Sequence, residues 1–328
     1  MKALSFDPST DTFDLIDKPI PEPSDYDVLL QVNACGLNPV DVKITQWKSL
    51  VPNMHAQWVP GLDVSGTVIA KGRYVTQWQI GDNVLTHGDM LKEHGGFAQY
   101  SVQDARSCIV HPNVDSAVAA ATPCAGWTAW RALVDKLRCR KGQSVFIAGG
   151  SGGVGSFAVQ IAAYFQLKPI IASCSKGNFD FVKSLGADHI IDYQQQDELD
   201  QIRDLTNGQG VNLGVDTVGI PTDQMVANAL GYEGKMVELV DVVRPDKYQD
   251  VFLKGLSFHQ LSLGSGHRNG EDALADLVLA GEEFSALLEQ GKLRVPKLAK
   301  VGFTDLKEAL LSIAKQRTVG KVVLSINE

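Results

Sequence analysis

The pattern of hydrophobic and polar residues changes near residue 119. Before it, the chain consists of short β-branched runs, such as 27–32 (DVLLQV) and 65–70 (SGTVIA), interrupted by Gly, Pro and Asp. Such punctuation is typical of strands, and there is little of the 3.6-residue periodicity of an amphipathic helix. We therefore predict a β-rich domain over residues 1–118.

In the next part of the chain, strand-like runs alternate with amphipathic helical runs. Residues 144–150 (SVFIAGG) are followed by a helical run over 154–165, and later strand-like runs repeat this order. Continuous apolar strands separated by helices indicate a parallel sheet that is covered on both faces. The pattern predicts an α/β domain over residues 119–288.

The remaining segment, 289–328, returns to strand. Its pattern predicts a strand-like run, then a helix over 303–316 (FTDLKEALLSIAKQ), then a final strand over 320–326 (GKVVLSI). A chain of 328 residues is about twice the usual size of one domain, which agrees with two domains.

Composition narrows the class of partner. The net charge of −8, with no basic run, argues against binding to nucleic acid or to anionic membranes. Apolar stretches end well short of the roughly 18 residues that a membrane-spanning helix needs, and the N-terminus lacks the apolar region of a signal peptide. Five scattered cysteines without a C-x-x-C pair favour reduced thiols. We expect a cytoplasmic protein.

Residues 144–162 contain Gly150-x-Gly152-x-x-Gly155 between an expected strand and an expected helix. In this context the pattern is the dinucleotide-binding fingerprint, whereas the alternative is a purely structural glycine turn. Gly150 would allow a tight turn, Gly152 the approach of a pyrophosphate, and Gly155 close packing of the helix, whose free N–H groups bind phosphate. The predicted cofactor-binding residues of this turn are Gly150, Ser151, Gly152, Gly153, Val154 and Gly155.

The cofactor type is indicated by the end of the second strand of this domain. An NAD site usually places Asp or Glu about twenty residues past the glycines. Here residues 173–176 read SCSK, with no acid. Ser175 and Lys176 suit a 2′-phosphate, which predicts NADPH; the alternative for Lys176 is a solvated lysine at a helix start. Tyr193 is a candidate contact for the adenosine end.

Asp216 and Gly219 lie at the end of another strand-like run, 212–218. In a doubly wound sheet a dinucleotide crosses where the strand order reverses, at the carboxyl ends of the strands. We expect both residues to lie at that place.

These residues, with others along almost the whole chain, resemble the medium-chain dehydrogenase/reductase superfamily, and within it the zinc-free quinone oxidoreductase branch. The resemblance implies a GroES-like β-rich catalytic domain, formed by 1–118 with 289–328, beside a Rossmann doubly wound parallel sheet. It also implies a homodimer that pairs through the last Rossmann strand, near 258–263 (FHQLSL). The matching segments are GLNPVDVKI, PGLDVSGTV, GDNVLTH, GGFAQYSV, ATPCAGWTAWRAL, AGGSGGVGSFAVQIA, SLGADHIIDY, VDTVG and TVGKVVL.

The resemblance also bears on whether the chain has a metal site. Zinc members have Cys where Asn38 stands and His-Glu where Leu62-Asp63 stands, and Cys124 alone cannot complete a catalytic zinc site of about three protein ligands. The loop 87–94, with His87, Asp89, Glu93 and His94, could bind zinc. We interpret it as a solvated rim of the substrate cleft, and we predict no metal.

In the resembled branch, NADPH delivers hydride to an electron-poor double bond or a quinone, and a proton follows. This implies Asn38 and Lys43 as donors near the developing oxyanion. Many quinone reductases have Tyr in place of Lys43, and Lys resembles the subgroup that reduces enones and alkenals, so the proton donor stays open. Asp41 either orients Lys43 or caps local backbone. Thr128 either lies near the nicotinamide amide or caps a helix.

Trp47, Met54 and Trp58 either line an apolar substrate pocket or pack in the core under a long loop. Together these observations predict an NADPH-dependent, metal-independent reductase of quinones or α,β-unsaturated carbonyls, acting on a small hydrophobic carbonyl or quinone substrate. The alternatives are a non-catalytic NADPH-binding sensor or scaffold, and an alcohol dehydrogenase, which would need a metal or another base.

Overall fold

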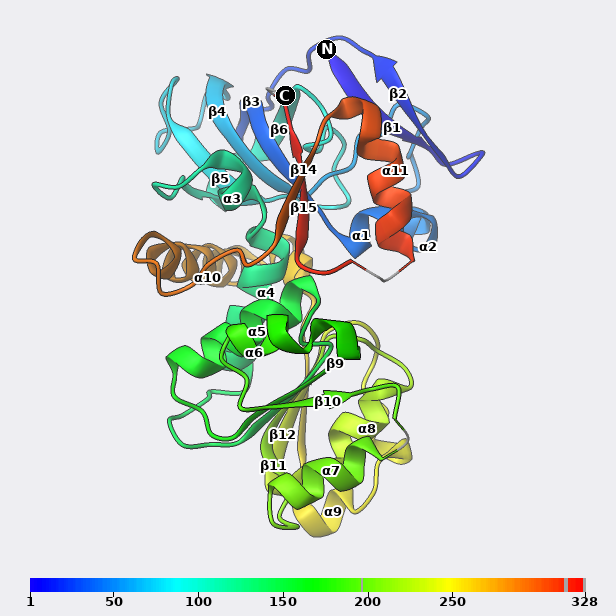
Figure 1. The fold of residues 1–328 in the computed structure, drawn as a ribbon. Coiled ribbons are helices and arrows are strands. Elements are labelled where there is room, and N and C mark those ends of the chain that lie inside the picture. The colour runs from blue at the N-terminus through cyan, green and yellow to red at the C-terminus, as the bar shows by residue number, and fades with distance from the viewer. Residues whose placement is uncertain (196, 316–317, 327–328) are drawn as a thin grey trace. The chain divides into compact units, whose positions relative to one another are not determined.

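The chain divides into two compact units in a computed structural model that describes residues 1–195, 197–315 and 318–326. The first unit is Met1–Trp127 with Leu263–Glu328, and the second is Thr128–Ser262 (Figure 1). The divisions lie near 128 and 263, whereas the sequence places the domain boundaries at 119 and 289. Those domain boundaries stay predictions.

The first unit is built on strands from both ends of the chain. Its main sheet has seven strands in the order β14-β15-β3-β4-β5-β7, with β6 paired to β3, and β1 and β2 form a separate antiparallel pair. All pairs of the main sheet are antiparallel except β14 with β15. The GroES-like β-rich fold is therefore confirmed. The strands are β1 (Lys2–Asp7), β2 (Thr12–Asp17), β3 (Asp27–Leu37), β4 (Asp63–Lys71), β5 (Asn83–His87), β6 (Tyr100–Asp104), β7 (Cys108–Val110), β14 (Leu298–Val301) and β15 (Lys321–Ser325).

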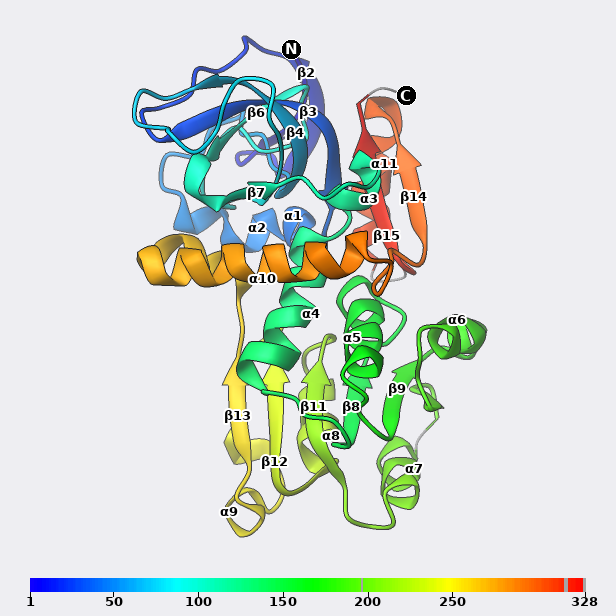
Figure 2. The ribbon, with the colours of Figure 1, turned by 90° about the vertical axis from the view of Figure 1, so that its left-hand side faces the viewer.

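Short helices connect these strands, and two longer ones cover them. α11 buries Leu306, Leu310 and Ile313, whose spacing forms one helical face, against the core of this unit. The long helix α10, visible in Figure 2, is not among the elements that the sequence predicts. It packs through Gly281 on the ring of Trp127, so it belongs to the first unit. The helices are α1 (Pro39–Val42), α2 (Ile44–Trp47), α3 (Ser116–Ala120), α10 (Glu271–Glu289) and α11 (Phe303–Ala314).

The second unit is a six-stranded parallel sheet in the order β10-β9-β8-β11-β12-β13. The order reverses between β8 and β11, as in a Rossmann sheet, which confirms the predicted fold class. β8 and β9 are buried along their whole length, because helices cover the sheet. The elements are α4 (Thr128–Trp130), β8 (Val145–Ala148), α5 (Gly153–Tyr164), β9 (Ile170–Cys174), α6 (Phe179–Ser184), β10 (His189–Asp192), α7 (Glu198–Leu205), β11 (Val211–Asp216), α8 (Thr222–Asn228), β12 (Leu230–Glu238), α9 (Val251–Lys254) and β13 (Ser257–Gln260).

The sequence contains no long apolar run, and the structure agrees. In the described ranges, no helix is both long and apolar enough to pass through a bilayer.

Candidate active site

The glycine loop joins β8 to α5, and its glycines have distinct roles. A Cβ on Gly155 would overlap the carbonyl oxygen of Gly149, so this position must be glycine for the helix to pack on the strand. A Cβ on Gly152 would find its nearest neighbour 3.4 Å away, which leaves this face of the loop open. The positive φ of the turn, 77°, belongs to Gly149 rather than to Gly150. Gly150 is needed for a different reason, because a Cβ there would lie 2.9 Å from the Cβ of Ala172.

The structure brings the predicted 2′-phosphate residues next to the glycine loop. Asn178 links the two segments, since its Nδ2 donates to Ser175 Oγ at 3.0 Å and lies 3.5 Å from Ser151 Oγ. Lys176 follows directly and is exposed. Two hydroxyls, an amide and a cation therefore border one surface, and no carboxylate ends β9. Asn178 is a residue that the sequence analysis missed, although an Asn at a helix start is a common signal of local hydrogen bonding.

The other predicted cofactor residues lie on different parts of the second unit. Tyr193 follows β10 and is 53% exposed, and Thr128 is the buried first residue of α4. Asp216 ends β11, and its Oδ1 accepts the backbone N–H groups of Val218 and Gly219 at 2.8 and 3.1 Å. The carboxyl group of Asp216 is thus turned to backbone of its own unit. Contacts of these residues with a cofactor stay predictions.

In the first unit, Asn38 is the centre of a buried polar cluster. Asn38 donates through Nδ2 to Asp63 Oδ2 at 2.8 Å and accepts, through Oδ1, a short hydrogen bond from Lys321 Nζ. The second Nδ2 hydrogen faces the carbonyl oxygen of Gly36 at 3.4 Å. Asn38, Asp63 and Lys321 are 1%, 0% and 4% exposed. Donation from Asn38 to a substrate would therefore require one of these hydrogen bonds to break.

Asp41 caps backbone, which is one of the two roles predicted for it. Its Oδ2 accepts the backbone N–H of Asn38 at 2.8 Å, closing the first turn of α1. Burial, with a further contribution from Asp63, raises the pKa of Asp41 to about 8. Asp41 makes no hydrogen bond or ion pair with the Lys43 side chain within the described ranges. Lys43 is half-buried at the end of α1, and no described side chain or carbonyl pairs with its ammonium group.

Asp63 and Cys124, two residues that the resemblance compares with the zinc site of other members, lie against each other. Asp63 Oδ1 accepts the backbone N–H of Cys124 at 2.9 Å, and burial raises the pKa of Asp63 to about 6 despite the nearby Lys321. Burial also raises the pKa of the Cys124 thiol. Across the described parts of the chain, no three His, Cys, Asp or Glu side chains come together in a way that could hold a metal ion.

Side chains of the loop 87–94 already form ion pairs and a ring contact with other residues. Glu93 binds Lys18 and His55, at 3.0 Å in both cases. His87 is buried, and burial together with His267 lowers its pKa to about 3, so its imidazole is neutral at ordinary pH. His267 stacks on His87 with ring centroids 6.0 Å apart.

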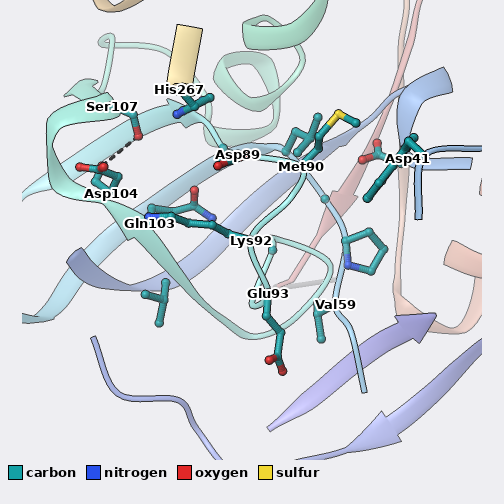
Figure 3. Close-up of a pocket in the computed structure, with 17 residues that line it drawn as sticks. Asp41, Val59, Asp89, Met90, Lys92, Glu93, Gln103, Asp104, Ser107 and His267 are labelled. Carbon is teal, nitrogen blue, oxygen red and sulfur yellow. Dashed lines mark hydrogen bonds between the residues drawn. The ribbon is translucent and has the colours of Figure 1, made fainter. Parts of the chain in front are cut away.

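A pocket of about 450 Å³, part of it open to solvent, lies in the first unit (Figure 3). Figure 3 shows Asp41 and Met90 on one side of it and His267 with Ser107 on the other. Residues 88–93 supply much of its wall, and their place at the rim of a substrate cleft stays a prediction. All three apolar candidates for a pocket, Trp47, Met54 and Trp58, pack in the core, and Trp47 also lines this pocket. Most of the other lining side chains are polar, among them Asp89, Lys92, Gln103 and Asp104.

Comparison with known proteins agrees with this two-part architecture. The family described as "Alcohol dehydrogenase GroES-like domain" matches residues 24–113, and that described as "Zinc-binding dehydrogenase" matches residues 153–278. The trans-enoyl reductase pgmF of Aspergillus terreus is 30% identical over 319 residues, which cover 92% of this chain and 86% of the relative. The chain belongs to the medium-chain dehydrogenase/reductase superfamily.

Other members of the superfamily with related sequences carry different names. The chloroplastic NADPH-dependent alkenal/one oxidoreductase of Arabidopsis thaliana is 33% identical over 71% of this chain and 60% of its own length. The solved structure of the quinone oxidoreductase from Coxiella burnetii has a TM-score of 0.83 at 26% identity and covers 99% of both chains. This medium-chain dehydrogenase/reductase thus has quinone oxidoreductase-like and enoyl reductase-like relatives.

Proposed function

We propose that this protein is an NADPH-dependent, metal-independent reductase of quinones or α,β-unsaturated carbonyls. The observation that carries the proposal is the surface formed by Ser151, Ser175 and Lys176 beside the open glycine loop. Hydroxyl groups and a cation, with no carboxylate at the end of β9, match a ribose phosphate better than a free ribose. A relative named as an NADPH-dependent alkenal/one oxidoreductase supports the same choice.

The glycine loop fits the rest of the cofactor. The face left open at Gly152 and the N–H groups at the start of α5 would bind the pyrophosphate. When bound there, NADPH supplies the hydride. The protein then has to provide a proton and to stabilise the oxyanion that develops on the acceptor.

Lys43 is the proton donor that we propose. Lys43 is half-buried and its ammonium group has no described partner, so it can turn towards an acceptor oxygen and give up a proton. Asn38 is less free, because its amide is held by Asp63 and Lys321. We assign to Asn38 and Asp41 the task of fixing the wall from which Lys43 projects. The pocket that Asp41 borders would receive the substrate, with Trp47 as an apolar contact.

The test is NADPH oxidation, followed by absorbance, with a panel of quinones and enones and with a chelator present. We expect turnover that survives chelation, with a preference for one acceptor class. Loss of turnover on chelation would contradict the metal-independent mechanism. Tight binding of NADPH without turnover of any acceptor would favour a non-catalytic sensor or scaffold.

A homodimer formed by pairing of β13, which lies at an edge of its sheet, and a cytoplasmic location also stay predictions. Sedimentation of the purified chain tests the first, and imaging of the tagged protein in its own cell tests the second.

A further inference from the structure

Asp216 and Glu238 end neighbouring parallel strands of the second unit at the same level. They are register partners in the pairing of β11 with β12. Both side chains are buried, with 0% and 1% exposure. Two carboxyl groups placed side by side without solvent are costly unless a proton or a cation compensates them.

Each carboxyl group binds the loop that follows its own strand. Asp216 Oδ1 accepts two backbone N–H groups of the loop 217–222. Glu238 Oε1 accepts the N–H groups of Val240 and Asp241 at 2.7 and 2.9 Å, in the loop after β12. The two carboxyl groups therefore fix the backbone of both loops where these leave the sheet.

The remaining oxygens, Asp216 Oδ2 and Glu238 Oε2, are buried, and no donor from the described residues reaches them. As register partners on adjacent strands, the two residues lie side by side. Burial first, and the charge of Glu238 second, raise the pKa of Asp216 to about 8. A single proton between the groups would turn two repelling acceptors into one donor and one acceptor.

The surroundings offer no described cation that could replace this proton. The register partners on the flanking strands β8 and β13 are neutral. Asp241 adds a further negative charge and accepts the N–H of Ile220 at 2.9 Å. Asp223 of α8 accepts hydrogen bonds from Arg244 and from the hydroxyl of Tyr248. The guanidinium of Arg244 is therefore already paired with another carboxylate.

The loop held by Asp216 touches the glycine loop. Thr217 Oγ1 donates to the carbonyl oxygen of Ala148, the last residue of β8, at 2.7 Å. A Cβ on Gly149 would lie 3.0 Å from the side chain of Val218. The 2′-phosphate surface lies at the end of β9, on the other side of the strand-order reversal. A dinucleotide that crosses the reversal must therefore place its nicotinamide half at the ends of β11 and β12.

We propose that Asp216 and Glu238 share one proton, and that this proton holds the loops 217–222 and 239–244 in the arrangement that receives the nicotinamide half of the cofactor. The inference rests on the proposed NADPH site. Asp216 and Glu238 act as positioning residues. Loss of the proton would place two negative charges against each other and separate the loops, so cofactor affinity falls as pH rises.

The test is the dissociation constant of NADPH, by fluorescence titration, from about pH 7 to about pH 9.5, where the charge of a phosphate monoester changes little. In the wild type we expect affinity to fall by about tenfold per pH unit above the pKa of Asp216, because only the protonated form is competent. In Glu238→Gln the amide donates permanently to Asp216 and affinity stays level. Glu233→Gln, an exposed carboxylate near the other end of β12, removes the same charge and should behave as wild type.

A melting curve of the cofactor-free protein from about pH 5 to about pH 8, the range in which a raised pKa makes stability fall with pH, separates this inference from the proposed function. We expect the wild type to lose thermal stability with rising pH more steeply than Glu238→Gln. Equal slopes would overturn the shared proton. Different slopes with no NADPH binding at any pH would keep the shared proton but overturn its role for the cofactor. NADPH binding with the same pH dependence in wild type and Glu238→Gln would overturn the inference and leave the proposed function standing.

Discussion

Lys321 on the last strand of the chain donates a hydrogen bond to the side-chain oxygen of Asn38, which follows β3. Asn38 in turn donates a hydrogen bond to Asp63, whose Oδ2 lies 3.9 Å from the Lys321 ammonium group. The three side chains are buried, so the positive charge of Lys321 compensates the carboxylate of Asp63 where water cannot. This cluster joins the C-terminal strand to the segment that carries Lys43.

We expect Lys321→Met to lower the free energy of unfolding by about 3 kcal/mol, because it leaves Asp63 buried without its cation. Urea denaturation measures this change. Lys300→Met, on the neighbouring strand β14, is the matched control, since Lys300 makes a 3.6 Å pair with Asp115 at the surface. Its effect should stay within about 0.5 kcal/mol. Equal losses of unfolding free energy in the two variants would show that the buried cluster stabilises the fold no more than a surface ion pair does.

The sequence predicts the fold well because periodicity and glycine placement are local signals. The strand, glycine turn and helix over 144–162 are confirmed as β8, the loop and α5. The long helix α10 is absent from the predicted elements, although it carries a regular apolar face with Leu277 and Phe284. Boundaries such as 289 depend on which neighbour such a helix packs against, and packing cannot be read from spacing alone.

The candidate site is less predictable, because its partners are far apart in sequence. Glu238 interrupts an apolar strand run and Lys321 begins one, and a charge at such a place signals a buried partner. The sequence does not say which partner. The sequence singles out Asn38 as a donor to the substrate oxygen, but only the structure shows that Asp63 and Lys321 occupy its amide.

We expect Lys43→Ala to lower the rate of NADPH oxidation by about a hundredfold or more, since a positioned proton donor contributes at least that much. The affinity for NADPH should not change. Lys48→Ala, one turn further along, removes a lysine that is paired with Asp11 at the surface and serves as control. Full activity of Lys43→Ala with the preferred acceptor would show that another group supplies the proton.

Lys176→Ala should weaken NADPH binding by about ten- to a hundredfold, the worth of one hydrogen bond to a charged group, and leave NADH binding unchanged. Paired titrations with NADPH and NADH measure the ratio of the two affinities. Lys183→Ala, an exposed lysine in the last turn of α6, controls for loss of charge. A parallel loss for both cofactors would mean that Lys176 does not distinguish the 2′-phosphate.

Two alanine substitutions in the glycine loop should separate cofactor binding from folding. In Gly152→Ala the added methyl group would lie 3.4 Å from its nearest neighbour, which is an ordinary contact. Stability should therefore stay near wild type while NADPH affinity falls. In Gly155→Ala the methyl group meets Gly149, so the free energy of unfolding should fall by about 1–3 kcal/mol. Thermal melts and NADPH titration of both variants provide the comparison. Undiminished affinity in Gly152→Ala would contradict the placing of the pyrophosphate.

The buried carboxyl of Asp41 should make the protein less stable as pH rises. Its pKa is about 8 in the folded chain, against about 3.9 in an unfolded one, so between these values the folded state binds the extra proton. The stabilising contribution is complete below about pH 4 and is lost as pH rises towards 8, by at most about 1.4 kcal/mol per pH unit.

Asp41→Asn removes this titration and keeps an oxygen for the backbone N–H of Asn38. Urea denaturation at several pH values should therefore show a shallower fall of stability in Asp41→Asn than in the wild type, with the remaining slope due to Asp63 and Asp216. Asp305→Asn is the control, because Asp305 is the third residue of α11 as Asp41 is of α1, but is exposed. If both variants kept the wild-type slope, Asp41 would be ionised in the folded protein, and its carboxylate would then need a cation close to it.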